Sequence, residues 1–242
     1  MRRYIIIIGA MKSGTTTLFD VLAQHPEIAP ASNKEPGFFA FEDIHAQGYD
    51  WFDGLFDFDP DQHRYRLEAS TDYTKTPFVT GVLERTTARE EGEVKLIYIM
   101  RHPLRRLESH ARHTERTRRE VGQIISPRPS HSLEAGLSPV SLATSAYATQ
   151  LKPYAAAREA GQLHCLTLEA LKGAPEPTLV NLVLPKGARD RISNRFRKQV
   201  HIVEGRFKLT DAEEASLANL YASDLGDLRD SYGIETERLW KL

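Results

Sequence analysis

The sequence predicts an α/β fold with a central parallel sheet and helices on both of its faces. An unbroken apolar run at residues 4–8 and two largely apolar runs at residues 94–100 and 163–168 suit buried parallel strands. Stretches with helical spacing alternate with these runs along the chain, as in βαβ units. A glycine-rich segment directly after the first run is typical of a phosphate-binding loop that opens a helix. A phosphate loop after the first strand is therefore part of the predicted fold.

The other elements follow from periodicity and from turn chemistry. Leu18, Val21 and Leu22 share one face of a first helix, which Pro26 closes. Residues 65–69 are expected to form a further interior strand. Helices are expected over residues 49–56, from Pro77 to about residue 90, from Pro103 to about residue 121, over residues 143–160, and over residues 212–221 with Leu217, Leu220 and Tyr221 on one face. Residues 122–141 lack periodicity and suggest a surface loop or lid, and residues 189–207 are basic and irregular.

Composition limits the classes of function. The 242 residues, 40% of them apolar, suit one domain over residues 1–242. The 32 Lys and Arg nearly cancel the 33 Asp and Glu, so broad nucleic-acid binding is not expected and any anion site must be local. The single Cys165 excludes an intramolecular disulfide and fits a reducing compartment. No apolar run is long enough to span a bilayer, so a cytoplasmic protein is expected.

The segment from Gly9 to Thr17 carries the clearest chemistry. A glycine-rich turn at a helix start points backbone N–H groups at one spot, where the helix dipole also favours an anion. Lys12 and three threonine hydroxyls complete this cradle. An ordinary strand-to-helix turn is the alternative, but it would not require glycines, lysine and hydroxyls together. The segment therefore predicts a phosphate site.

The details of this loop disfavour a nucleoside triphosphate bound with Mg²⁺. Gly9 and Gly14 have the spacing of G-x-x-x-x-G-K-[ST], but Thr15 stands where that motif has its lysine. Lys12 instead precedes the second glycine. The strand at residues 94–100 runs into Arg101, whereas a magnesium site needs an acidic residue there. The sequence thus favours a nucleotide with two separate anionic groups and no metal ion.

Two motifs resemble those of sulfotransferases that use 3′-phosphoadenosine 5′-phosphosulfate (PAPS). Residues 9–18 resemble the 5′-phosphosulfate loop, and residues 101–109 resemble the 3′-phosphate motif, with an Arg, a Pro, and a Ser eight residues after the Arg. The resemblance continues through residues 34–39, 49–52, 68–73 and 232–240. It implies a P-loop NTPase-like sulfotransferase fold, PAPS as donor with 3′-phosphoadenosine 5′-phosphate (PAP) as product, and transfer to a hydroxyl of a sugar, lipid or natural product. The bacterial and heparan-type carbohydrate enzymes are the most similar branch.

The resemblance also implies roles in donor binding. Lys12 would stabilise the phosphate oxygen that leaves, and Arg101 and Ser109 would grip the 3′-phosphate. The 5′-phosphate would be held by Ser13, Gly14, Thr15, Thr16 and Thr17. Arg197 and Lys198 lie in a late basic segment that is expected to close over the nucleotide.

On the acceptor side, Glu35 resembles the glutamate that acts as general base in the heparan-type enzymes. Burial or the nearby apolar Phe38 and Phe39 should raise the pKa of this carboxyl. Phe38, Asp72 and Tyr73 are expected to contact the acceptor. Ala69 replaces a lysine of the family segment Glu-Lys-(Ser/Thr)-Pro-x-Tyr and Thr71 replaces its proline, which argues against a heparan-like acceptor; Lys75 is a candidate for a displaced cation.

Three alternatives stay open from the sequence. A histidine could serve as the base, as in the small-molecule cytosolic sulfotransferases. The chain could be a P-loop small-molecule kinase, although Lys12 is displaced for that role. It could also be a nucleotide-binding protein without catalysis. The expected partner is a small-molecule or glycan acceptor, with no nucleic acid, no membrane span and no bound metal.

Overall fold

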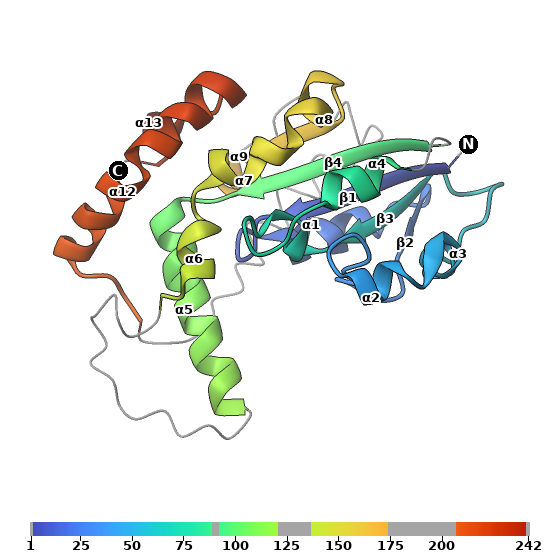
Figure 1. Cartoon of the computed structure of the whole chain (residues 1–242), viewed down its shortest axis with the longest axis horizontal. Helices are drawn as coiled ribbons and strands as arrows, with labels where there is room; N and C mark the ends of the chain where they lie inside the picture. Colours follow the sequence, from blue (N-terminus) through green and yellow to red (C-terminus); the bar gives the residue numbers. More distant parts are fainter. Residues whose placement is uncertain (1, 89–91, 121–136, 174–206, 241–242) are drawn as a thin grey trace. The chain divides into compact units, whose positions relative to one another are not determined.

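The computed structural model describes residues 2–88, 92–120, 137–173 and 207–240 (Figure 1). The chain divides into two compact units, one of residues 1–100 with 151–200 and one of residues 101–150 with 201–242. Among the described residues, the first unit contains the whole sheet and the second consists of helices and their connections. The expectation of a single domain over residues 1–242 stays a prediction.

The sheet has five parallel strands, which confirms the predicted α/β class. Their spatial order is β2 (Ile28–Pro30), β3 (Tyr65–Ala69), β1 (Arg2–Gly9), β4 (Gly92–Met100) and β5 (Leu163–Thr167). In the central rows Ile6 of β1 lies opposite Glu68 of β3 and Leu96 of β4. Four of these strands, β1, β3, β4 and β5, lie close to the strand segments predicted from the sequence. The three residues of β2 are too few to show a periodicity, and the sequence did not predict this strand.

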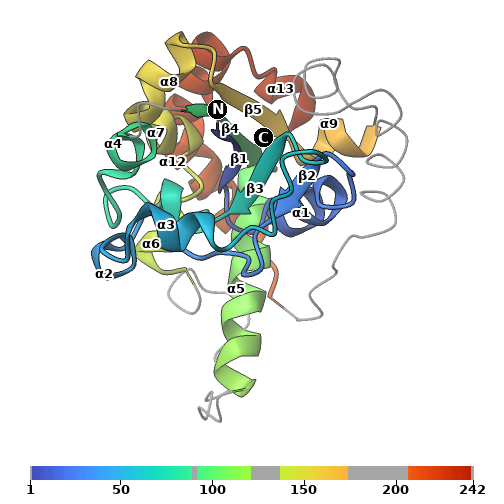
Figure 2. The same cartoon turned by 90° about the vertical axis from the view of Figure 1, so that its right-hand side faces the viewer.

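The first face of the sheet is covered by α1 (Thr15–Leu22) and α9 (Leu168–Gly173) (Figure 2). Successive side chains of a strand point to opposite faces, so Ile5 and Ile7 of β1 point to this side. They are fully buried there in an apolar cluster with Leu18 of α1 and Leu171 of α9. Burial of each such side chain away from water contributes about 2 kcal/mol to the stability of the folded protein.

The second face meets a layer rich in aromatic side chains. In Figure 2, α3 (Gly48–Asp53) and α4 (Val82–Thr87) lie on the side opposite to α1, and α2 (Glu42–His45) precedes them in the chain. Tyr4, one residue out of step with Ile5, has its ring centroid 5.8 Å from that of Phe52. Tyr4 also donates a hydrogen bond to Asp53. Alternation along one strand therefore separates an aliphatic face from an aromatic and partly polar face.

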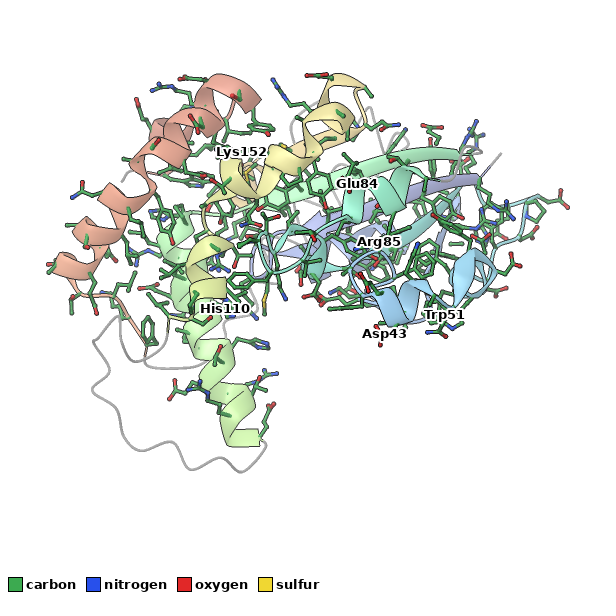
Figure 3. All side chains as sticks on the ribbon, in the orientation of Figure 1. Asp43, Trp51, Glu84, Arg85, His110 and Lys152 are labelled. Atoms are coloured by element: carbon green, nitrogen blue, oxygen red, sulfur yellow. The ribbon has the colours of Figure 1, made fainter. Side chains whose placement is uncertain are left out.

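Two predicted helices differ from the structure. The helix expected from Pro77 begins only at Val82, because Gly81 takes a left-handed backbone (φ 73°) in front of it. The Arg85 guanidinium, labelled in Figure 3, donates to the carbonyl of Thr80 at 2.6 Å and holds the preceding turn. The segment 49–56, expected to be helical, forms α3 only as far as Asp53.

The region from residue 137 to 160 is also built differently from the prediction. One helix was expected over residues 143–160, but α6 (Pro139–Ala143), α7 (Tyr147–Leu151), the 3₁₀ turn η3 (Lys152–Tyr154) and α8 (Ala155–Glu159) replace it. Pro153 lacks an N–H and interrupts the helical ladder. Ser138 caps α6 by accepting a hydrogen bond from the Ser141 amide at 3.2 Å. The prediction of a loop over residues 122–141 was therefore wrong for its last residues, which belong to α6. Residues 121–136 and 174–206 lie outside the described residues.

In the second unit, α5 (Pro103–Glu120) matches the predicted helix, and α12 (Asp211–Tyr232) extends the one expected over residues 212–221. Leu217 and Tyr221 are buried, but Leu220 is 61% exposed, so the prediction of one shared face was wrong for Leu220. The short helix α13 (Thr236–Leu239) follows. No helix in the described part of the chain combines the length and the apolar character that crossing a membrane requires.

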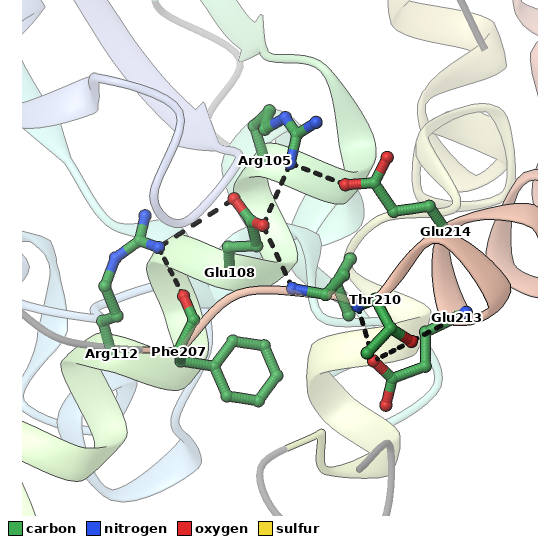
Figure 4. A network of polar contacts seen from close by, with 8 residues as sticks. Arg105, Glu108, Arg112, Phe207, Thr210, Glu213 and Glu214 are labelled. Atoms are coloured by element: carbon green, nitrogen blue, oxygen red, sulfur yellow. Dashed lines mark hydrogen bonds and ion pairs between the residues drawn. The ribbon is translucent and has the colours of Figure 1, made fainter. Parts of the chain in front are cut away.

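A polar network joins α5 to the start of α12 (Figure 4). Glu108, 5% exposed, accepts from Arg105 at 3.0 Å and from the Leu209 amide at 3.2 Å. Arg112 donates to the carbonyl of Phe207 at 2.9 Å. Thr210 and Glu213 form a capping box at the start of α12. Some of the arginines of α5 therefore stabilise the packing of this helix against the start of α12.

Gly9 should be the least replaceable glycine of the sheet. Its φ is 150°, and a Cβ there would lie 2.1 Å from Thr74 Oγ1 and 2.9 Å from the Tyr98 ring. Gly9→Ala should cost about 3 kcal/mol of unfolding free energy from strain and overlap. The control is Gly161→Ala, which has φ 69° and open space around the added methyl, and should cost about 1 kcal/mol. Equal losses for both variants in urea denaturation would contradict the steric argument.

Candidate functional site

The loop between β1 and α1 is held at both ends by its backbone. The Ala10 amide donates to the carbonyl of Ile99 on β4 at 2.8 Å, and the Ser13 amide donates to the carbonyl of Ala10 at 3.1 Å. Gly14 has a left-handed backbone (φ 100°) directly before the first residue of α1. Lys12, between these points, also has a positive φ of 69°. A non-glycine residue in this region costs energy, which marks the loop as constrained.

The start of α1 has the properties of an anion site. No described side chain caps this helix, and its first turn holds no acidic residue. Its first amides therefore have no partner within the helix. The Ser13 hydroxyl is fully buried and has no hydrogen-bond partner among the described residues. Thr15 and Thr17 are buried, whereas Thr16 is exposed. A phosphate group would satisfy these donors.

Glu35 lies on the loop that follows β2 and has a positive φ of 63°. Its carboxylate accepts from Lys34 Nζ at 2.7 Å through Oε1 and from Thr71 Oγ1 at 3.4 Å through Oε2. The side chain of Glu35 is 39% exposed. The expectation that Glu35 is buried was therefore wrong, because the aromatic side chains that follow it turn inward without covering it.

The segment 69–74 after β3 connects the two loops. The Glu35 amide donates to the carbonyl of Ala69 at 2.8 Å, and Thr74 Oγ1 donates to the carbonyl of Ile8 at 2.7 Å, at the end of β1. The loops that carry Lys12 and Glu35 thus meet one segment at the carboxyl edge of the sheet. This is the edge where ligands bind in open α/β sheets.

The other residues predicted to contact the acceptor differ in their exposure to solvent. Asp72 is partly exposed and forms an ion pair with Lys75 at 2.5 Å. Tyr73 is 2% exposed, and its hydroxyl accepts from the Phe39 amide at 3.3 Å. Phe38 is fully buried, with its ring stacked on Phe52 at 4.6 Å between centroids. A direct contact between Phe38 and an acceptor stays a prediction.

Glu68 is the residue of this region that sequence reasoning passed over. Its side chain is fully buried on β3. Burial raises the pKa of Glu68 from 4.5 to about 8, and the nearby Glu35 carboxylate adds to the rise, while hydrogen bonds from Ser70 and Tyr73 oppose it. Glu68 therefore binds a proton at neutral pH. Its signal in the sequence was a carboxyl group inside an otherwise interior strand, next to an alanine that replaces a family lysine.

The residues predicted to bind the 3′-phosphate belong to the second unit. Arg101 follows β4 directly, and its backbone is held by the fully buried Tyr147, whose hydroxyl donates to the Arg101 carbonyl at 2.7 Å and accepts from its amide at 3.4 Å. Ser109 lies on α5 and is 6% exposed. Arg197 and Lys198 lie outside the described residues.

Comparison with known proteins gives the family. The model of the sulfotransferase domain family matches residues 2–183. The chain is 35% identical over 103 residues to the membrane-associated sulfotransferase kil1 of Dictyostelium discoideum and 32% identical over 101 residues to the heparan sulfate glucosamine 3-O-sulfotransferase 5 of Mus musculus. Each match covers 42% of this chain, but only 21% and 28% of those two relatives.

A solved structure supports the fold over nearly the whole length. The sulfotransferase from Alicyclobacillus acidocaldarius superposes with a TM-score of 0.66 over 95% of each chain at 24% sequence identity. At this identity the likeness concerns the fold alone. It agrees with the α/β fold that the sequence predicts.

The raised pKa of Glu68 makes stability depend on pH. The folded protein holds this proton up to about pH 8, whereas the unfolded chain holds it only up to about pH 4.5. The contribution of the protonated Glu68 to the free energy of unfolding is therefore fully present below pH 4.5 and is lost as the pH rises to about 8. Glu68→Gln cannot ionise. Relative to wild type, its unfolding free energy should rise by about 1.4 kcal/mol per pH unit within this window. A constant difference between the two proteins from pH 5 to pH 8 in urea denaturation would show that Glu68 titrates normally.

Proposed function

Since the chain belongs to the sulfotransferase domain family, we propose that it transfers a sulfuryl group from PAPS to a hydroxyl of a sugar, lipid or natural product. The assignment of catalytic roles to Lys12 and Glu35 rests on one observation. Among the described residues, Lys12 and Glu35 are the two non-glycine residues with a positive φ. Such strained backbones cluster at active sites, where the surrounding structure holds them in place. Lys12 and Glu35 are also the residues to which the resemblance gives the leaving group and the proton.

Donor binding follows from the two anion sites. The amides that open α1, with the hydroxyls of Ser13, Thr15, Thr16 and Thr17, would hold the 5′-phosphate, and Gly14 lets the chain turn into this helix. Arg101 and Ser109 would hold the 3′-phosphate, with Tyr147 fixing the Arg101 backbone. Arg197 and Lys198 enter the proposal from the sequence only.

The transfer step needs one acid or cation and one base. The S–O bond to the acceptor oxygen forms while the S–O bond to the 5′-phosphate breaks. Lys12 stabilises the negative charge that develops on the leaving phosphate oxygen. Glu35 takes the proton of the acceptor hydroxyl. Lys34 and Thr71 contact separate oxygens of Glu35 and orient its carboxylate.

The charges around Glu35 favour an acceptor without many negative groups. Position 69, where the family has a lysine, is a fully buried alanine in the apolar cluster beneath α1. Lys34 is paired with Glu35 and Lys75 with Asp72. In the described part of the first unit these two lysines are the cations closest in sequence to Glu35 and Asp72. A neutral or weakly charged hydroxyl compound therefore suits this side better than a sulfated glycan.

The catalytic roles can be tested with radiolabelled PAPS and an extract of the source organism as the pool of acceptors. Lys12→Ala should lower the rate of sulfate incorporation by about 10²–10³-fold. Glu35→Gln should lower it by about 10²–10⁴-fold, because the amide cannot take a proton. Lys152→Ala and Glu159→Gln, both at exposed positions, are the matched controls and should keep the wild-type rate.

Each outcome of this assay has one reading. Full activity of Lys12→Ala would overturn the leaving-group role, and full activity of Glu35→Gln would move the base to another residue, with a histidine as the next candidate. Phosphate transfer from ATP that depends on Mg²⁺, without sulfate transfer, would identify a kinase instead. Binding of PAP without any turnover would identify a nucleotide-binding protein.

The 3′-phosphate grip can be tested by calorimetry with two nucleotides. Arg101→Ala should weaken binding of PAP by about 10–100-fold, because a charge-assisted hydrogen bond is lost. Ser109→Ala should weaken it by about 3–10-fold, as for a neutral hydrogen bond. Binding of adenosine 5′-phosphosulfate, which has no 3′-phosphate, should change little in both variants. Equal losses for both nucleotides would place these residues elsewhere in the site.

A further inference from the structure

The loop that carries Glu35 is attached to the segment after β3 by alternate backbone amides. Glu35 donates to the carbonyl of Ala69 at 2.8 Å, Gly37 donates to Ser70 Oγ at 3.0 Å, and Phe39 donates to the Tyr73 hydroxyl at 3.3 Å. The first acceptor is a backbone carbonyl and is fixed by the sheet. The other two acceptors are side-chain hydroxyls, which rotate unless something fixes them.

Glu68 is placed to fix the Ser70 hydroxyl. Ser70 Oγ donates its proton to Glu68 Oε1, and the lone pairs of Ser70 Oγ are then available to accept from the Gly37 amide. The Tyr73 hydroxyl acts on the Glu68 carboxyl by lowering its pKa, while Glu68 Oε2 is buried without a hydrogen-bond partner among the described residues. Glu68 and Ser70 are two residues apart and so point to the same face of β3, toward the aromatic layer that contains Phe38 and Phe39.

Further contacts hold this network from behind. Tyr154, 2% exposed, donates to the carbonyl of Tyr73 at 2.6 Å. Arg85 donates to the carbonyl of Phe39 at 2.7 Å. The Glu35 loop is therefore bonded to the carbonyl of Ala69 at its start and to Arg85 at its end, and between these points it is attached to the hydroxyls of Ser70 and Tyr73.

We propose that Glu68 is a positioning residue for the general base: its carboxyl orients the Ser70 hydroxyl, and this hydroxyl, together with that of Tyr73, holds the loop in which Glu35 keeps its left-handed backbone. This inference rests on the proposed function for the role of Glu35, but the attachment of the loop can be measured without any activity. Glu68 lies beneath the loop and does not touch the reacting atoms. The charged groups that act on its carboxyl are Glu35 and Lys34, both on the attached loop.

The sharpest contrast is between two replacements of Glu68. Glu68→Gln keeps an oxygen that accepts from Ser70 and is neutral, as the carboxyl is at pH 7. Glu68→Ala removes the acceptor. Ser70→Ala removes only the link to Gly37 and leaves a much smaller cavity, so it keeps the proposal testable if Glu68→Ala does not fold. Glu159→Ala, at an exposed position on α8, is the control.

The first measurement is amide hydrogen exchange of the full chain at pH 7. Exchange of the Gly37 amide should be about tenfold faster or more in Glu68→Ala, since the Ser70 hydroxyl that accepts from it loses its own acceptor and is no longer held in one orientation. Ser70→Ala should expose Gly37 alone. Glu68→Gln and Glu159→Ala should match wild type. Unchanged protection of Gly37 in both Glu68→Ala and Ser70→Ala would overturn the proposal.

The second measurement is turnover, with release of labelled sulfate from PAPS to water as the reaction that needs no known acceptor. Glu68→Ala should lower kcat by about 10–100-fold, because the base is displaced, while the Kd of PAP stays within about twofold of wild type. Glu68→Gln should restore kcat to within about threefold. Wild-type kcat in a folded Glu68→Ala protein would overturn the positioning role. A wild-type protein that binds no PAP and releases no sulfate would instead refute the proposed function, and the exchange experiment would still decide the role of Glu68.

Discussion

The close approach of three chain segments at Gly9 is the constraint on which the candidate site depends. At the end of β1 the backbone passes between Thr74 and Tyr98 with no room for a side chain. Thr74 donates to the carbonyl of Ile8, and the Ala10 amide donates to the carbonyl of Ile99. The loop from Gly9 to Thr17 thus starts in a fixed direction, hydrogen-bonded to β4 on one side and to the segment after β3 on the other. Preorganisation of this kind lets a site hold charge without rearranging its own dipoles.

The register of β3 decides which chemistry faces which layer. Glu68 and Ala69 are neighbours, so they point to opposite faces of the sheet. Ala69 lies in the apolar cluster under α1, and Glu68 meets the hydroxyls of Ser70 and Tyr73 on the other face. A slip by one residue would put a carboxyl into the aliphatic core, at a cost that this cluster could not offset. Burial of Glu68 therefore fixes the register and at the same time provides a polar centre beneath the Glu35 loop.

Much of the fold could be predicted from the sequence, because β1, β4 and β5 are largely apolar segments that alternate with helical ones. The order of residue types between β1 and α1 also predicts a phosphate loop. The failures have local causes. A left-handed Gly81 delays α4, and Pro153 divides the region predicted as one helix. The exposure of Glu35 could not be predicted, because it depends on side chains that come together only in the folded protein, whereas the burial of Glu68 had a signal in the sequence, its place in a strand expected to be interior.

The segment from residue 69 to residue 74 gives the site a coupling that neither motif shows alone. It bonds to the strand that leads into the Lys12 loop through Thr74, and to the Glu35 loop through Ala69, Ser70 and Tyr73. If Lys12 stabilises the leaving oxygen and Glu35 takes the proton, one segment sets the position of both groups, so a shift in it would misplace them together. Misplacement of reacting groups by about 1 Å costs about 10²-fold in rate. This explains why a segment that supplies neither the leaving-group cation nor the base is so densely hydrogen-bonded, and why the acidic Glu68 directly before it lies inside the protein.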